Sequence, residues 1–195
     1  MNASHLINLF DRKLKPKGFR RKKATWNRGR DAFVEVIDVQ TSKDGDSVTL
    51  NAGVLSLSIY SLCWGRDAEP FIEEPFCTVR ARIGQLLDNK DLWWEVGDTR
   101  AIDDMTDRLE RQIFPFLERM RSLGGMRDWL ASTGVPSPKS PLPSLCFAVL
   151  QSQLGDMDNA CAVLSDLEHR ALGAWGAKAQ EIAARIGCRS RTTSV

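Results

Sequence analysis

Two apolar runs in the N-terminal half have the pattern of neighbouring β-strands. They span residues 32–40 and 47–59 and are rich in β-branched and apolar residues. The loop between them contains Asp44-Gly45, a pair that favours a tight reversal because glycine adopts positive φ easily. Apolar residues occupy both faces of each run, which indicates central strands of a sheet. Their parity changes within the second run, so we expect a β-bulge at Gly53.

Shorter patterns on either side of this pair predict a first helix and further strands. Alternation continues over 77–83, although residues 81–87 have a helical alternative. A turn over 27–31 would lead into the first central strand. The other expected elements are a helix over 4–14, a hairpin formed by 19–23 and 25–28, and a short strand over 92–96.

From about residue 99 the apolar spacing changes to three and four, which is typical of a helix. The apolar stripe runs to Met120, and a shorter helix is expected over 126–132. Pro115 lies inside the stripe, so we expect the long helix to kink or split there, because proline lacks the backbone N–H.

A proline-rich segment divides the rest of the chain. Residues 134–143 hold four of the eight prolines and are typical of a stiff connection. Three Ala/Leu-rich helices are expected after it, and the first two have the pattern of a tetratricopeptide helix–turn–helix unit. One such unit cannot bury its own apolar face, so it must dock on the N-terminal domain or on another chain. The expected domains are 1–133 as an α+β domain, 134–143 as the connection, 144–188 as a helical appendage and 189–195 as a frayed tail.

These elements together predict an α+β fold. We expect an antiparallel sheet of roughly four to six strands, an N-terminal helix, a long helix packed on the sheet and a small C-terminal helical segment. At 195 residues, with 43% hydrophobic and 27% charged residues, the chain has the composition of a folded protein. It contains no apolar run near the roughly 18 residues of a membrane span and no signal-peptide pattern at its start.

The five cysteines are odd in number and form no Cys-x-x-Cys motif. Free thiols in a reducing compartment are the simplest interpretation, so a cytoplasmic location is expected.

Charge is distributed unevenly although the net charge is only +2. Residues 11–30 contain ten Lys/Arg and one acidic residue, which leaves the remainder negative. This basic run, with Phe19 and Trp26 interleaved, suggests contacts to nucleic acid or another polyanion. A solvated face or an acidic protein partner are the alternatives. The candidate polyanion-binding residues are Lys17, Arg20, Arg21, Lys22, Lys23 and Arg28.

Polar residues on the expected strands form a second candidate site. Asp38 and Gln40 share one face of their strand, as Arg80 and Arg82 share one face of theirs. Converging carboxylate, amide and guanidinium groups could hold a polar ligand through bidentate contacts. An internal salt-bridge network is the alternative, and an enzyme using Asp38, Arg80 and Arg82 is another. The candidate ligand-binding residues are Asp38, Gln40, Asn51, Arg80, Arg82 and Trp94; the last is one of an adjacent tryptophan pair, Trp93-Trp94, of which one member would fill the core.

Other chemistry lacks a sequence signature. His5 and His169 are far apart with no nucleophile pattern nearby, so surface positions are expected for both. There is no metal-ligand spacing, phosphate-binding loop or nucleophile elbow. We therefore expect no catalytic residues, no metal and no cofactor.

Several short motifs, in this order, resemble a bacterial family known as domain of unknown function 4304. The resemblance covers residues 5–120, and it implies an α+β domain with no established activity or assigned functional residue. The helices after residue 134 lie outside it. The motifs are Lys15-Pro-Lys-Gly-Phe-Arg20, Trp26-Asn-Arg28, Val36-Ile-Asp-Val-Gln40 with Ser42, Asn51-Ala-Gly-Val54, Cys77-Thr-Val-Arg-Ala-Arg-Ile83 and Trp93-Trp94.

The expected function is a non-enzymatic binding protein of bacterial type. It would recognise a protein or a small polar ligand through its sheet face, and an immunity-like role against toxins is one example, by analogy with other small α+β domains. Nucleic-acid or polyanion binding through the basic run is the alternative function. No membrane association is expected, and the C-terminal helices could support a dimer.

Overall fold

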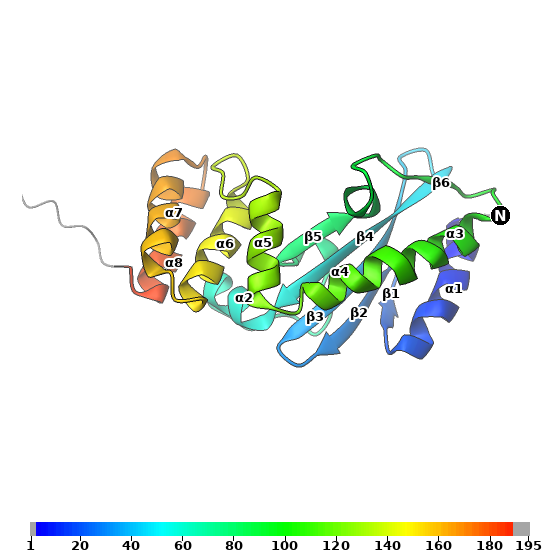
Figure 1. Ribbon diagram of the computed structural model, residues 1–195, viewed down its shortest axis with the longest axis horizontal. Coiled ribbons are helices and arrows are strands. Elements are labelled where there is room, and N and C mark those ends of the chain that lie inside the picture. Colours follow the sequence, from blue (N-terminus) through cyan, green and yellow to red (C-terminus); the bar gives the residue numbers. More distant parts are fainter. Residues whose placement is uncertain (1–2, 189–195) are drawn as a thin grey trace, which may run out of the picture. The chain divides into compact units, whose positions relative to one another are not determined.

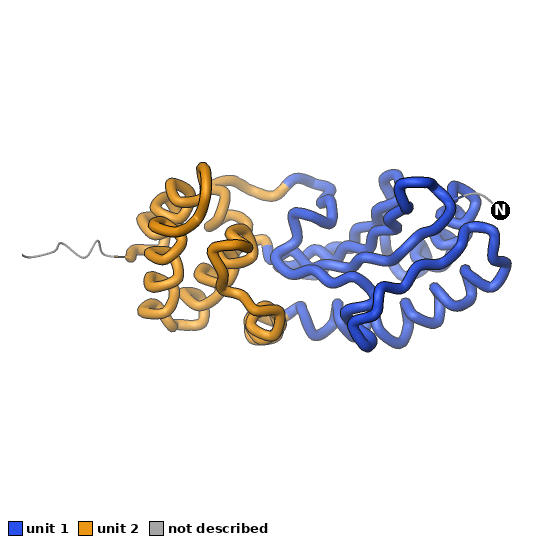
Figure 2. The backbone as a smooth tube through the Cα atoms, turned by 90° about the horizontal axis from the view of Figure 1, so that it is seen from above, with its two compact units in different colours: residues 1–56, 69–121 blue, residues 57–68, 122–195 orange. Residues whose placement is uncertain are grey.

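The structure, a computed structural model, describes residues 3–188 of the chain. Contacts divide it into two compact units, coloured separately in Figure 2. Unit 1 combines the chain up to residue 56 with residues 69–121, and unit 2 combines residues 57–68 with the chain from residue 122. The expected boundary after residue 133 therefore falls inside unit 2. The tail expected over 189–195 lies outside the described residues.

Unit 1 contains a six-stranded antiparallel sheet. Five strands follow one another across it in chain order, and the short β6 also pairs with β4 (Figure 1). The predicted α+β fold is thereby confirmed. The strands are β1 (Arg20–Lys22), β2 (Thr25–Arg30), β3 (Phe33–Thr41), β4 (Ser47–Ser56), β5 (Val79–Arg82) and β6 (Trp94–Glu95).

The longest strand, β4, has no bulge at Gly53. Its register with β3 is unbroken from Val48 to Ser56, so the predicted bulge is wrong. Gly53 has a different role, because a Cβ atom there would lie 2.7 Å from both Cβ and Sγ of Cys77. The apolar parity changes because the strand ends at Ser56 and the next residues form helix α2 (Leu57–Trp64).

Other strand boundaries also differ from the sequence expectation. β2 continues to Arg30, so the turn expected over 27–31 is confined to the residues after it, where Asp31 has a φ of 50°. β5 is shorter than the predicted strand because short 3-10 helices precede and follow it. These are η2 (Glu74–Phe76) and η3 (Ile83–Leu86).

Helices cover one face of the sheet. From α1 (Ala3–Leu14), Phe10 packs edge-on against Trp26 of β2, with ring centroids 5.5 Å apart. A long helix runs without a break from Ala101 to Arg119. Of the kink or split predicted at Pro115, the split is absent, and the turn before this proline widens to a π-helical turn. The long helix comprises α3 (Ala101–Arg108), the π-helical η4 (Leu109–Ile113) and α4 (Phe114–Arg119), and the 3-10 turn η1 (Lys15–Lys17) follows α1.

Unit 2 is helical. The three helices predicted after the proline-rich segment are present and pack on one another in chain order, while α2 and α5 contact α6. Asp156 caps α7, as its carboxylate accepts a hydrogen bond from the amide of Asn159. Unit 2 therefore has a core of its own, to which Leu150, Leu164 and Ile182 contribute. Its helices are α2, α5 (Leu123–Ser132), α6 (Pro141–Gln153), α7 (Met157–Arg170) and α8 (Trp175–Ile186).

Two of the five cysteines form a disulfide. Cys161 lies in the first half of α7 and Cys188 follows α8, and their Cα atoms are 5.6 Å apart. The prediction of five free thiols is therefore wrong: two consecutive helices that pack against each other bring together residues separated by 27 positions. Cys63, Cys77 and Cys146 are free and buried.

Candidate functional site

The face of the sheet opposite α1 and α3 carries the polar side chains of interest, and we call it the polar face. Strand register places five residues, one from each of β1 to β5, in a single line across it. We call this line the cross-sheet row. Its members, in order, are Lys22, Thr25, Asp38, Asn51 and Arg82.

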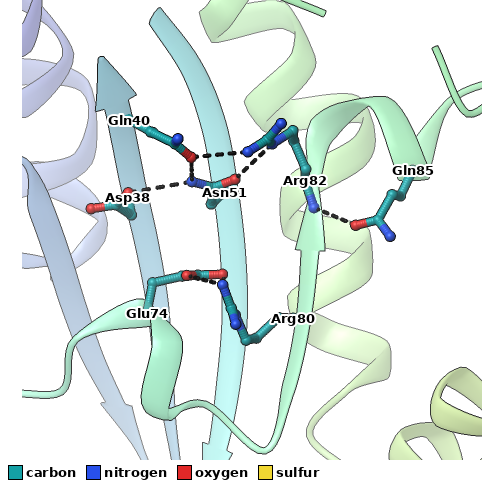
Figure 3. Close-up of polar contacts among 7 residues, drawn as sticks. All are labelled: Asp38, Gln40, Asn51, Glu74, Arg80, Arg82 and Gln85. Atoms are coloured by element: carbon teal, nitrogen blue, oxygen red, sulfur yellow. Dashed lines mark hydrogen bonds and ion pairs between the residues drawn. The ribbon is translucent and has the colours of Figure 1, made fainter. Parts of the chain in front are cut away.

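Hydrogen bonds connect four members of the row, which are Thr25, Asp38, Asn51 and Arg82. Figure 3 shows the bonds among the last three. The Thr25 hydroxyl donates to one carboxylate oxygen of Asp38 at 2.8 Å, and the Asn51 amide approaches the other at 3.4 Å. Arg82 Nε in turn lies 3.5 Å from Asn51 Oδ1. Gln40 closes the group, because its Oε1 accepts from both Asn51 and Arg82 at 3.1 Å. Thus the predicted convergence of Asp38, Gln40, Asn51 and Arg82 is present in the structure.

Arg82 is held at the end of the row by a loop. Its Nη1 lies 3.2 Å from Asp91 Oδ1, and its guanidinium stacks 5.5 Å from the ring centroid of Trp93. Hydrogen bonds from Trp93 and then Arg82 lower the pKa of Asp91, so this carboxylate stays ionised. The backbone N–H of Arg82 donates to the side chain of Gln85. The Arg82 head group is thereby fixed in direction while its side chain remains 34% exposed.

Arg80 belongs to a separate pair on the same face. Its guanidinium donates two hydrogen bonds, of 2.7 and 2.8 Å, to the carboxylate of Glu74, whose side chain is only 6% exposed (Figure 3). The neighbouring Cys77 is fully buried. Burial, followed by the negative charge of Glu74, raises the pKa of Cys77 well above that of an ordinary thiol. This burial and the nearby negative charge favour the neutral form of the thiol.

Trp94 does not lie on the polar face, which corrects its place among the candidate ligand-binding residues. It is paired with Val48, so its side chain is directed to the helix-covered face, where Nε1 donates to Asp104 of α3 at 2.7 Å. Adjacent residues on a strand point to opposite faces, and Trp93 is the member of the pair beside Arg82. The prediction that one tryptophan fills the core is correct.

Three of the six predicted polyanion-binding residues contact other elements of the fold. Arg28 donates to the buried Glu35 at 2.5 Å and stacks 4.4 Å from the centroid of Phe19. Lys17 pairs with Glu110 at 2.8 Å, and Arg21 donates to Asn8 of α1 at 2.9 Å. These three predicted polyanion-binding residues therefore connect β1, β2 and the η1 turn to neighbouring elements.

The remaining three lie at the exposed edge of the sheet. Arg20 and Lys22 belong to β1, the edge strand, and Lys23 follows it with a φ of 57°. All three are exposed, and Lys22 Nζ lies 5.8 Å from the centroid of the Phe71 ring. They form a small basic edge at the Lys22 end of the cross-sheet row.

The described residues hold no group of three or more His, Cys, Asp or Glu side chains arranged for a metal ion. His5 and His169 are exposed, as predicted, and His169 Nδ1 contacts the carbonyl of Ser165. The chemistry that the polar face offers is therefore hydrogen bonding and charge.

Sequence reasoning missed four residues of this face. Thr25, Glu74, Asp91 and Trp93 each bind or stack on a predicted residue. The position of Thr25 could have been predicted, because a two-residue hairpin turn pairs it with Lys22 and places it on the strand next to Asp38. Glu74 and Asp91 lie outside the strands, where alternation gives no information.

Comparison with known proteins gives one match. The model of the family described as Domain of unknown function (DUF4304) matches residues 10–119. This range contains the whole sheet and every residue of the polar face, and it ends before α5. No curated protein and no solved structure matches the chain. Within the described residues, none of the helices combines the length and apolar character needed to cross a membrane.

Proposed function

The chain belongs to the family described as Domain of unknown function (DUF4304), and we propose that it is a non-enzymatic binding protein that holds a protein partner on its polar face. The cross-sheet row carries this proposal. Polar side chains there are fixed by one another and remain partly exposed, which is the state of a preorganised recognition surface.

Exposed apolar residues in the segments that precede and follow β5 favour a protein over a small ligand. Phe76 is 51% exposed on η2, which packs against β3 and β4. Leu87 is 37% exposed in the loop that also supplies Asp91. Exposed aromatic and apolar side chains combined with arginine are typical of protein–protein interfaces.

The alternative of an enzyme receives less support from the same contacts. Asp38 and Arg82 belong to different strands separated by β4, and Asn51 lies between them. Arg80 donates to Glu74, so it is directed away from a shared substrate position. The thiol of Cys77, the potential nucleophile nearby, is buried.

Site-specific cross-linking tests the proposal. A photoreactive amino acid replaces Gln40, which is exposed at the row, and a matched control replaces Arg100, whose side chain is 89% exposed outside the polar face. Irradiation in lysate of the native host should give a discrete protein adduct from position 40 and none from position 100. Identical products at both positions, or none at position 40, would overturn the proposal.

The basic edge supports a second candidate function, binding of nucleic acid or another polyanion. Arg20 and Lys23 are exposed on the edge strand and its turn. Polyanion affinity should fall steeply with salt, and the Arg20→Ala/Lys23→Ala variant should reduce both the affinity and its salt slope. Fluorescence anisotropy with a labelled single-stranded oligonucleotide gives both quantities, and affinity unaffected by salt would exclude this function.

A further inference from the structure

The arginines of the polar face are paired, whereas the carboxylate at the centre of the row is not. Arg80 is neutralised by Glu74 and Arg82 by Asp91, each through an ion pair of 3.2 Å or less. Asp38 forms no ion pair among the residues that the structure describes, and its hydrogen bonds come from the neutral donors Thr25 and Asn51. Arg80 interacts with Asp38 through its charge without a hydrogen bond, because its own hydrogen bonds go to Glu74. The carboxylate at the centre of the row therefore has no cation in direct contact with it among the described residues.

The hydrogen bonds to Asp38 hold this carboxylate in place and come from uncharged groups. Thr25 donates to Oδ1 and Asn51 to Oδ2, so both oxygens are fixed in direction. Each carboxylate oxygen has a further lone pair that can accept a hydrogen bond. The side chain is half-buried, so an ion pair formed with it would be screened by water less than one on a fully exposed surface.

A second carboxylate on the same face extends the negative charge along β4. Glu95 is exposed and is paired in register with Ser47, which lies on the same side of β4 as Asn51. Ser47 and Asn51 are four residues apart, which corresponds to about 13 Å along a strand. Glu95, like Asp38, forms no ion pair with any residue in the described part of the chain.

We propose that the partner of the polar face is a basic protein segment, and that it anchors an arginine or lysine side chain on Asp38. The inference rests on the proposed function and adds the chemistry of the partner. The incoming cation would donate to the carboxylate lone pairs that Thr25 and Asn51 leave open, and Gln40 Oε1 lies next to the same position. A second basic residue of the segment would reach Glu95.

A blocked arginine peptide, acetyl-Gly-Arg-Gly-amide, is the probe for the anchor. Its binding is followed by NMR through the side-chain amide resonances of Asn51, and the citrulline peptide of equal shape serves as the uncharged control. We expect the arginine peptide to shift these resonances in a saturable manner and the citrulline peptide to leave them unchanged. Equal shifts from both peptides, or no shift from either, would overturn the inference.

A matched pair of variants tests the residue. Asp38→Asn keeps acceptor oxygen and shape but removes the charge, and it should weaken arginine-peptide binding at least about fivefold. Asp107→Asn removes a carboxylate that pairs with Arg111 on the long helix and should leave binding unchanged. Equal affinity of Asp38→Asn and the unmodified protein would refute the anchor. If the cross-link at position 40 forms but the arginine peptide does not bind, the anchor on Asp38 is refuted and the proposed protein partner is not. If the peptide binds but no cross-link forms, the proposed protein partner is refuted.

Discussion

At the residue scale, the basic run shows that neighbouring cations of one sequence can have opposite roles. Arg28 is 16% exposed at its side chain and faces Glu35, which is 1% exposed and also approached by Arg30 and Arg121. Arg20, in the same run, is exposed on the edge strand. The sequence shows the number of charges, but only the register of β2 with β3 shows which of them is opposite a buried carboxylate.

Replacement of these two arginines should separate the two roles. Arg28→Ala leaves Glu35 buried with its closest partner removed, so the free energy of unfolding should fall by about 3 kcal/mol. Arg20→Ala should change it by less than about 0.5 kcal/mol, as an exposed substitution does. Chemical denaturation measures both values, and a loss for Arg28→Ala no larger than that for Arg20→Ala would contradict the structural role.

Glycines provide a second residue-scale test. Gly53→Ala places a methyl group 2.7 Å from Cys77 Cβ and 3.0 Å from the Val79 carbonyl, so it should destabilise unit 1 by about 2 kcal/mol or more. Gly29 lies in β2, and a methyl group added there would meet no atom within 4 Å, so Gly29→Ala is the matched control and should be neutral or slightly stabilising. Thermal unfolding of the two variants decides the matter: similar melting temperatures would mean that Gly53 is not a close-packing position.

At the element scale, alternation and helical spacing predicted most of the helices and strands but failed at positions where one element ends and the next begins. The strands around Asp38 and Asn51 follow from β-branched residues and the Asp44-Gly45 turn. The start of α2 was missed because Leu57 and Ile59 fit a strand as well as a helix. Asp38 and Arg82 lie in one line only because of the register in which β5 pairs with β4. The sequence does not determine that register, because a long irregular connection separates the two strands.

The disulfide between α7 and α8 leads to a prediction at this scale. Unfolding in denaturant without reductant should expose three thiols to alkylation, because Cys161 and Cys188 remain joined. Loss of this cross-link, which spans 27 positions, should cost unit 2 about 3.5 kcal/mol by the chain-entropy estimate. Mass spectrometry after alkylation counts the thiols, and five labelled cysteines in protein purified without reductant would contradict the disulfide.

At the scale of the whole molecule, the chain combines a sheet unit that carries the polar face with a helical unit that has its own core. The family match covers the sheet unit and ends before α5, so the polar face lies within the part of the chain that the family defines. The proline-rich segment predicted one domain with an appendage, but residues 57–68 join the helical unit because contacts, rather than chain order, define the units. A net charge of +2 gave no indication of the single unpaired carboxylate in the row.

The most direct test of the account is the equilibrium affinity for the partner captured at position 40, measured by isothermal titration calorimetry. Arg82→Ala removes the guanidinium that holds Gln40 and Asn51 in position, so the row loses its fixed geometry and binding should weaken at least about tenfold. Arg100→Ala, the exposed control outside the polar face, should bind within about twofold of the unmodified protein. Equal affinities for all three proteins, with each of them folded, would contradict the claim that the polar face is the binding surface.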